Sequence, residues 1–213
     1  MEKTPPLTSL LVSGVLLLVA ILAEATIYPQ IHTLDQEILK HVNIRQGNLL
    51  VEAVAATGSI EFTGLIAIAV LAWEYYRLRK VGPDTIGLWT GLALSMTLVF
   101  LLKQGLATPR PPTSGYMSRA GGLLGRVDQY AFPSGHTTRA STIASYYTGR
   151  RGTLTTIALW AWALAVAVSR IIQGVHWSSD VIAGLIVGWF SGVFGKIIGS
   201  RLAEEYSVFK RQG

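Results

Sequence analysis

The chain has no cysteine and few charged residues. Without cysteine there is no disulfide bond, no thiolate nucleophile and no cysteine-ligated metal. Charged residues make up only 14% of the 213 residues, whereas soluble domains carry about a quarter. Half of the residues are hydrophobic, and the mean hydropathy is +0.43. This composition favours an integral membrane protein over a soluble one.

The charge balance is basic, with a formal net charge of +6 and a pI of about 9.7. In a soluble protein such a balance would favour nucleic-acid binding. Here the basic residues lie mainly between apolar runs, where Lys and Arg set the orientation of a membrane protein. We therefore expect no nucleic-acid partner.

Apolar runs divide the sequence into six segments that fit membrane-spanning helices, which need roughly 20 apolar residues or somewhat fewer when protein shields them. The fourth run is the shortest and the most polar. The stretches LDQEILKHV and GNLLVEAVAA have the apolar spacing of short helices lying in the membrane interface. The sequence thus predicts one all-α domain over residues 1–213, an integral membrane bundle of six transmembrane helices with short interfacial helices. The six predicted spans cover residues 7–28, 57–76, 85–102, 132–147, 154–172 and 181–198.

Lys and Arg in the short loops predict the orientation of this bundle, because cytoplasmic loops are enriched in them. With both termini in the cytoplasm, the polar stretch 103–132 and the segment after residue 172 face the outside of the cell. The long stretch carries its own arginines, which a specific function would explain: Arg110, Arg119 and Arg126. The basic residues that we place on the cytoplasmic side are Lys3, Arg77, Arg79, Lys80, Arg150, Arg151, Lys210 and Arg211.

Three motifs bring reactive side chains to the outer face of this topology. The first is KQGLATPRP, with Lys103 and Arg110, and the second is PSGH, with Ser134, Gly135 and His136. The third is SRIIQGVHWSSD, with Arg170, His176 and Asp180. Each motif alone has a structural interpretation, as an interfacial cation, a helix cap or a His–Asp pair. Their joint arrival at one face favours a common site.

The cations of these motifs, Lys103, Arg110 and Arg170, lie within or beside apolar segments, where an unpaired charge costs at least about 2.5 kcal/mol. Few carboxylates are nearby to compensate them. A bound phosphate would do so, and the planar fork of arginine suits phosphate oxygens. Ser134 and Gly135 lie where a helix is predicted to begin, so the backbone N–H groups there can bind the same anion.

The two histidines suit different steps of a phosphoryl transfer. His176 and Asp180 are four residues apart, so they share a face if this stretch is helical. The aspartate can hold one ring nitrogen protonated and leave the other as a nucleophile. His136 would be the general acid that protonates the leaving oxygen. The reaction would pass through a phosphohistidine on His176, which water then hydrolyses.

The three motifs resemble the pattern of the type 2 phosphatidic acid phosphatase (PAP2) superfamily: Lys-x6-Arg-Pro, Pro-Ser-Gly-His and Ser-Arg-x5-His-x3-Asp. Residues 103–180 match every fixed position in order and spacing. The resemblance implies a six-helix core with its site at the outer leaflet and a reaction that needs no metal or other cofactor. It also implies the roles of the site residues, with His136 as the acid, His176 as the nucleophile and Asp180 as its partner. The implied phosphate ligands are Lys103, Arg110, Ser134, Gly135 and Arg170.

We therefore expect a multi-pass membrane enzyme that hydrolyses a phosphate or diphosphate from a membrane lipid. A polyprenyl diphosphate is the favoured substrate, and phosphatidylglycerophosphate or phosphatidate is the alternative. A lipid phosphotransferase would use the same residues. An anion transporter would leave the spacing of His176 and Asp180 unexplained.

Other residues have weaker interpretations. Arg139 would add positive potential one turn after His136. Trp177 is expected to be an aromatic anchor at the membrane interface. Acidic residues in or near the spans are expected to face the interface or pair with a basic residue: Glu24, Glu52 and Glu61.

Overall fold

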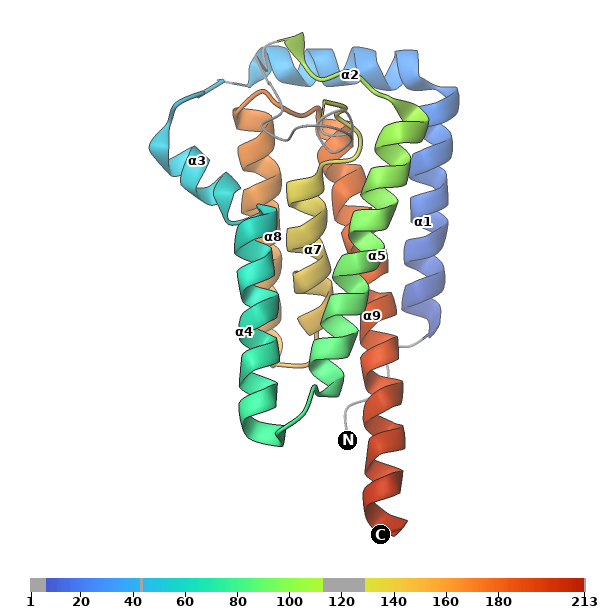
Figure 1. The fold of residues 1–213 in the computed structure, drawn as a ribbon. Coiled ribbons are helices and arrows are strands. Elements are labelled where there is room, and N and C mark those ends of the chain that lie inside the picture. Colours follow the sequence, from blue (N-terminus) through green and yellow to red (C-terminus); the bar gives the residue numbers. More distant parts are fainter. Residues whose placement is uncertain (1–6, 43, 113–128, 213) are drawn as a thin grey trace.

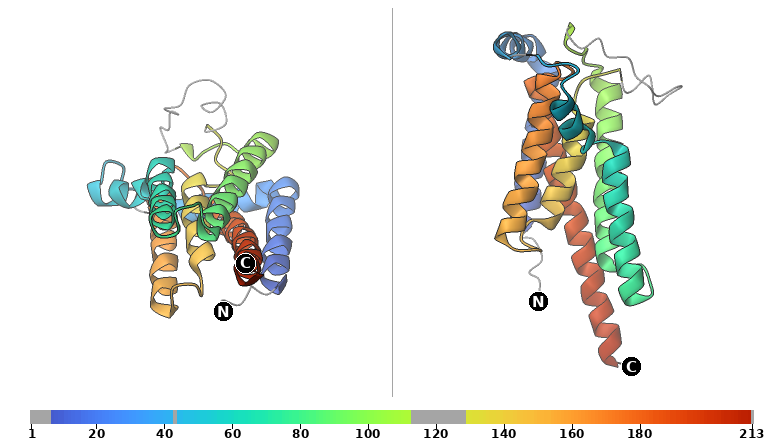
Figure 2. Two further views of the ribbon diagram at one scale, coloured as in Figure 1. Left: turned by 60° about the horizontal axis from the view of Figure 1, so that its bottom comes forward. Right: turned by 90° about the vertical axis from the view of Figure 1, so that its left-hand side faces the viewer.

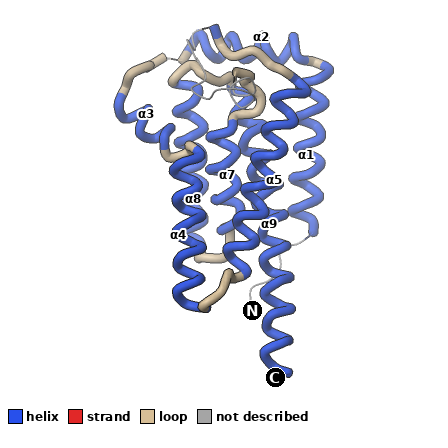
Figure 3. Tube along the Cα trace, viewed as in Figure 1, coloured by secondary structure: helices blue, strands red, loops and turns tan. Residues whose placement is uncertain are grey.

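A computed structural model describes residues 7–42, 44–112 and 129–212 of the chain, and Arg119 and Arg126 lie outside them. These residues form eight helices and no strand (Figures 1 and 3), which confirms the all-α prediction. Two short helices lie between α1 (Leu7–Thr26) and α4 (Ile60–Leu78) in the sequence: α2 (Tyr28–His41) and α3 (Leu49–Ala56). The others are α5 (Pro83–Leu106), α7 (Gly135–Tyr147), α8 (Thr153–Ile172) and α9 (Ser178–Gln212).

Four helices are long and apolar enough to cross a membrane: α1, α5, α8 and the Ser178–Glu204 part of α9. Helices α3 and α4 pass the same test together, bent by 45° at their junction, which gives up to five spans in the described residues. All six predicted runs do form helices. However, α7 has only 13 residues, about 20 Å of helix, against a hydrocarbon core of about 30 Å. The prediction of six transmembrane helices is therefore not confirmed.

Helix α7 lies inside the bundle (Figure 2), and its side chains from Thr137 to Tyr147 are buried. Its hydroxyl groups bond to the backbone of α9: Ser141 Oγ donates to the carbonyl of Leu185 at 2.7 Å, and Ser145 Oγ to that of Trp189 at 3.0 Å. Such bonds satisfy polar groups away from water and hold neighbouring helices together. The polar composition of the fourth run therefore reflects burial in protein.

Glycines on α9 bring this helix close to α7. A Cβ atom at Gly188 would collide with the carbonyl oxygen of Thr138, and one at Gly192 would lie 2.5 Å from that of Thr142. Only glycine permits such an approach of one backbone to another. The contact aligns the start of α7 with the start of α9, where the second and third motifs lie.

Helix α2 lies across one end of the bundle, which we call the α2 end (Figures 1 and 2). The first turn of α1 and the last turn of α9 lie at the opposite end (Figure 1). Helix α2 exposes apolar side chains such as Leu34 and Ile38, and its one buried residue is Asp35. The helices predicted between residues 29 and 55 are thus confirmed, while their place in a membrane interface stays a prediction.

Candidate active site

All three motifs lie at the α2 end of the bundle, although they come from four helices. Lys103 is in the last turn of α5, and Arg110 lies in the segment that follows it. His136 is in the first turn of α7, and Arg170 is in the last turn of α8. The third motif then continues through His176 into the first turn of α9, which contains Asp180.

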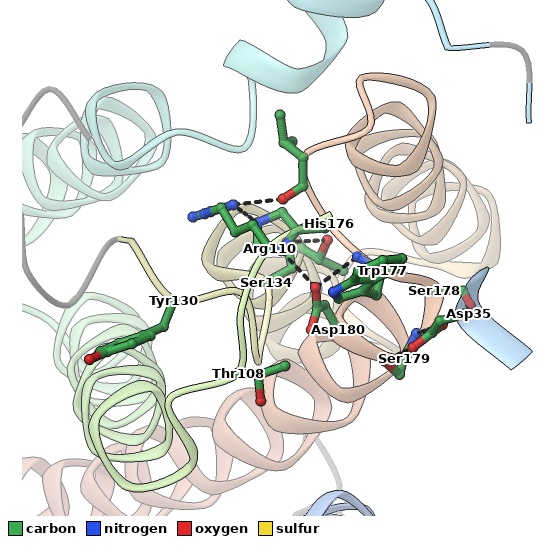
Figure 4. Close-up of polar contacts among 12 residues, drawn as sticks. Asp35, Thr108, Arg110, Tyr130, Ser134, His176, Trp177, Ser178, Ser179 and Asp180 are labelled. Atoms are coloured by element: carbon green, nitrogen blue, oxygen red, sulfur yellow. Dashed lines mark hydrogen bonds and ion pairs between the residues drawn. The ribbon is translucent and has the colours of Figure 1, made fainter. Parts of the chain in front are cut away.

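A chain of contacts runs from Arg110 through His176 to Asp180 (Figure 4). Arg110 Nη1 lies 3.2 Å from His176 Nε2, and His176 Nδ1 lies 3.2 Å from Asp180 Oδ2. A guanidinium group can only donate, so Nε2 is the accepting nitrogen and the ring proton is on Nδ1, facing the carboxylate. This arrangement leaves a lone pair on Nε2, as the sequence hypothesis requires.

His176 and Asp180 are in contact, but not through a shared helical face as the sequence suggested. His176 precedes α9, which begins at Ser178, so the two residues do not share a helical face. Instead, Asp180 Oδ2 also accepts the backbone N–H of Trp177 at 2.8 Å. An acidic side chain at the third helical position commonly reaches back to the residue before the helix in this way. The helix cap thus holds the carboxylate against His176, with both side chains buried.

The second motif is joined to the third through the backbone. Ser134 N–H donates to the carbonyl of Asp180 at 3.0 Å, and the hydroxyl of Thr137 donates to Ser134 Oγ at 3.1 Å. Helix α7 begins at Gly135, as predicted, with Ser134 as its N-cap. The first N–H groups of a helix have no partner within it, and they favour an anion. The PSGH segment therefore offers anion-binding groups beside the His176–Asp180 pair.

Burial lowers the pKa of the His176 imidazole well below its ordinary value, and positive charges nearby lower it further. These charges belong to the first and third motifs: Arg110, Arg170 and Lys103. The imidazole of His136, from the second motif, also lies close enough to lower this pKa. The motifs therefore meet around one imidazole. A lowered pKa keeps His176 neutral near pH 7, which is the form with a nucleophilic lone pair.

Local bonds hold the two other cations in place. Arg170 Nη1 donates to Gln173 Oε1 at 2.6 Å, and the Lys103 ammonium donates to the carbonyl of Tyr130. Both side chains are buried. Among the described residues, no group of three His, Cys, Asp or Glu side chains is arranged as a metal site. The arrangement of cations around a neutral imidazole suits a tetrahedral anion such as a phosphoryl group.

Two carboxylates support the site in ways that the sequence analysis missed. Asp35 of α2 accepts bonds from Ser178 and Ser179 at the start of α9. Glu24 of α1 is buried and accepts the hydroxyl of Thr108 at 2.8 Å, two residues before Arg110. We expected the Glu24 side chain to face the membrane interface or to pair with a basic residue. It is instead buried and bonded to a threonine. Asp35 belongs to no motif, so the sequence alone offered no signal for it.

Two further expectations can be compared with the structure. Trp177 is only 3% exposed, and its indole Nε1 donates to the carbonyl of Pro109 at 2.8 Å, so its prediction as an interfacial anchor is wrong. The tryptophan instead ties the third motif to the first. Arg139 is buried, and its Nε donates to the carbonyl of Gly58 at 3.0 Å, which joins α7 to the start of α4.

The comparison with protein families agrees with the motif pattern. Residues 84–202, more than half of the chain, match the PAP2 superfamily. The chain belongs to this superfamily. Two solved structures share its fold. The transmembrane PAP2 type phosphatidylglycerolphosphate phosphatase of Bacillus subtilis has a TM-score of 0.73 at 19% identity, covering 91% of this chain and 97% of that one. Aquifex aeolicus LpxE has a TM-score of 0.59 at 24% identity, and the match covers 76% of this chain and 94% of that one.

Curated relatives match over shorter stretches. Phosphatidylglycerophosphatase B of Escherichia coli is 41% identical over 64 residues, 28% of this chain and 25% of that protein. Undecaprenyl-diphosphatase of Sulfolobus acidocaldarius is 32% identical over 133 residues, 59% of each chain. Lipid A 4'-phosphatase of Porphyromonas gingivalis is 39% identical over 141 residues, 61% of this chain and 58% of that protein. The matches thus span between a quarter and three-fifths of these relatives. With its candidate spans and PAP2 fold, the chain is a multi-pass membrane protein.

Proposed function

We propose that this protein is a phosphatase that hydrolyses a phosphate ester or diphosphate of a membrane lipid. The observation that carries the proposal is the contact chain of Arg110, His176 and Asp180, in which one ring nitrogen faces a carboxylate and the other faces a guanidinium. Membership of the PAP2 superfamily supports it, as do the phosphatase names of the matched relatives.

In the first step of the proposed reaction, His176 Nε2 attacks phosphorus, and the bond from phosphorus to the lipid oxygen breaks. His136 donates a proton to the departing oxygen, which leaves as a lipid alcohol or, from a diphosphate, as a lipid monophosphate. Water then attacks the phosphohistidine while His136 takes up a proton from it. Inorganic phosphate is released, and His176 returns to its neutral form.

The remaining residues stabilise charge during these steps. Asp180 keeps the Nδ1 proton in place and offsets the positive charge that develops on the ring of His176. Arg110, Arg170 and Lys103 would bind the equatorial oxygens, with the Ser134–Gly135 backbone assisting. Such stabilisation usually contributes most of the rate enhancement in enzymatic phosphoryl transfer. No metal or other cofactor takes part in the proposed mechanism.

Among lipids we favour a polyprenyl diphosphate, because a diphosphate brings more negative charge to a strongly cationic site. The undecaprenyl-diphosphatase from Sulfolobus acidocaldarius, matched over 59% of this chain, supports this choice. The second candidate is phosphatidylglycerophosphate or phosphatidate. It is favoured by the fold shared with the Bacillus subtilis phosphatase, which covers 91% of this chain.

We further propose that six helices belong to the membrane-embedded bundle, namely α1, α4, α5, α7, α8 and α9. The short helix α7 is shielded there by its neighbours, since its side chains from Thr137 to Tyr147 are buried. The α2 end then faces the outside of the cell, and both termini are cytoplasmic. The start of α1 and the end of α9 both lie on the side opposite the α2 end, in keeping with this orientation (Figure 1). The basic residues of the α4–α5 and α7–α8 loops support the same direction.

Phosphate release from a panel of purified lipids in detergent tests the proposal. The panel contains a polyprenyl diphosphate, phosphatidylglycerophosphate and phosphatidate, each assayed with wild type and with His176→Ala. We expect release that depends on His176. Absence of release from every lipid would contradict the phosphatase. Transfer of the phosphoryl group to an added lipid alcohol in preference to water would identify a phosphotransferase instead.

A further inference from the structure

Helix α2 lies outside the bundle, yet it buries one carboxylate. The side chain of Asp35 is only 3% exposed, while Glu37 on the same helix is exposed and bonds to Lys40. Burying a carboxylate is unfavourable unless partners compensate for the lost water. The partners of Asp35 therefore indicate what this helix contributes to the protein.

These partners are the first two residues of α9 (Figure 4). Asp35 Oδ1 accepts the hydroxyl of Ser178 and the backbone N–H of Ser179 at 3.0 Å. Oδ2 accepts the hydroxyl of Ser179 at 2.5 Å. The first N–H groups of a helix lack partners within it, and negative charge is favourable there. Asp35 thus caps α9 from a helix more than 140 residues away in the sequence.

The capped turn of α9 is also the turn that organises the reacting groups. Asp180 follows Ser179 directly, and its carboxylate holds His176 at 3.2 Å. Its carbonyl accepts the N–H of Ser134 at 3.0 Å, so the position of α7 also depends on this turn. A shift of the first turn of α9 would therefore move the partner of the nucleophile and the start of the PSGH segment together.

A second contact from α2 secures the residue between His176 and Ser178. The ring of His32, one turn before Asp35 on α2, lies edge-on to the ring of Trp177, with centroids 4.5 Å apart. The same indole donates to the carbonyl of Pro109, the neighbour of Arg110. Helix α2 thus holds the His176–Asp180 segment at two points, one of which extends to the first motif.

We propose that Asp35 is a positioning residue, which fixes the first turn of α9 so that Asp180 and Arg110 keep their places on either side of His176. The role in turnover rests on the proposed phosphatase function. Asp35 touches none of the proposed reacting atoms, so it acts through Ser178, Ser179 and Asp180. If it only stabilised the fold, its loss would lower the Tm and leave the chemistry of the folded enzyme unchanged.

The kinetic test compares Asp35→Leu, which keeps the branched shape of the side chain and removes the bonds, with Glu37→Ala on the same helix as the matched control. We expect kcat of Asp35→Leu to fall about 10- to 100-fold, because small displacements of reacting groups have effects of that size. KM should change less than about threefold, since the phosphate ligands remain. Glu37→Ala should retain the wild-type kcat. An unchanged kcat in folded Asp35→Leu would overturn the proposal.

Two further variants separate positioning from folding. Asp35→Asn retains an oxygen for Ser178 and Ser179 N–H, and its amide can donate to the Ser179 hydroxyl, so it should recover much of the lost kcat. Ser179→Ala removes a hydroxyl donor and should lower kcat by a smaller factor. In Asp35→Leu the same substitution should add little, because the shared contact is already lost. If the two substitutions lowered kcat by factors that multiply fully in the double variant, Asp35 would not act through Ser179. If Asp35→Leu does not fold, kcat is compared between Glu37→Ala and the two milder variants, Asp35→Asn and Ser179→Ala.

A spectroscopic measurement tests positioning without turnover. The chain has four histidines, so the ¹⁵N signals of the His176 ring can be assigned by their loss in His176→Ala. We expect a signal of the Nδ1-protonated form in wild type and in Glu37→Ala. Asp35→Leu, or Ser179→Ala in its place, should shift or broaden it. An unchanged His176 signal in these variants would overturn the positioning role. Failure of the wild type to release phosphate would contradict only the proposed function.

Discussion

Arg110 Nη1 and His176 Nε2 lie 3.2 Å apart. The guanidinium thus donates to the nitrogen that we propose as the nucleophile, while Asp180 fixes the proton on the opposite side of the ring. A phosphoryl group entering the site would offer oxygens to the same guanidinium and so release the lone pair of Nε2. Arg110 is then both a phosphate ligand and a partner that keeps the ring oriented before substrate binds.

Replacing His176 with alanine should lower kcat by at least roughly 10³-fold, because no other group can form the covalent intermediate. The matched control is His41→Ala, which removes an exposed imidazole from α2. The control should retain the wild-type rate. Both variants are compared by phosphate release and by their Tm in detergent. An active and folded His176→Ala enzyme would remove the assignment of the nucleophile.

Replacing Arg110 with lysine preserves the charge and should still lower kcat/KM by about 10²- to 10³-fold, the usual effect of losing one donor to a reacting oxyanion. A lysine cannot donate through a planar fork and would not reach phosphate and His176 in the same geometry. The comparison is Arg77→Lys, at an exposed position in the last turn of α4. Equal activity of Arg110→Lys and wild type would show that charge alone suffices.

The pH dependence of kcat/KM should reflect the lowered pKa of His176, which burial and Arg110 cause. The free enzyme is active with His176 neutral, so activity is present above this pKa and is lost as the pH falls through it. Because a histidine ordinarily titrates at about 6.5, the acid limb that His176 causes should lie below pH 6.5. A wild-type profile without any acid limb below pH 6.5 would contradict the assignment. The stability that the neutral imidazole contributes should fall over the same range.

The close approach of α7 and α9 should depend on Gly188. In Gly188→Ala the new methyl group would meet the carbonyl of Thr138 and the side chain of Ser141, which we expect to cost about 1–3 kcal/mol of stability. Gly64→Ala is the matched control, since a Cβ at this helical glycine has no atom within 4 Å. It should be neutral or stabilising by up to about 1 kcal/mol. Thermal unfolding in detergent measures both, and equal Tm values would refute the packing argument.

Excess EDTA should leave the rate of phosphate release nearly unchanged, because the proposed charge stabilisation comes from Lys103, Arg110 and Arg170. The measurement compares purified enzyme before and after prolonged chelation, with added magnesium as the reverse test. Strong inhibition by EDTA that magnesium restores would point to a metal mechanism.

The local elements, and the motif residues that meet at the candidate site, could be predicted from the sequence. Apolar runs of sufficient length become helices wherever they lie, so each predicted span coincides with a helix. Motif spacing likewise pointed to His136, His176 and Asp180, whose catalytic roles remain a proposal, because a reaction needs particular side chains in a particular order. The start of α7 at Gly135 followed from the same PSGH segment.

The surroundings of each residue could not be predicted, because they depend on contacts between distant parts of the chain. The fourth run became a short interior helix because glycines of α9 allow the two backbones to approach closely. Carbonyl groups of α9 also accept bonds from the hydroxyl groups of α7. Trp177 is buried because α2 and Pro109 cover it. The bond from Asp35 to Ser178 joins residues 143 positions apart. The sequence thus determined which groups exist and where the helices form, while tertiary packing decided which groups meet, since burial and capping need partners that local sequence does not supply.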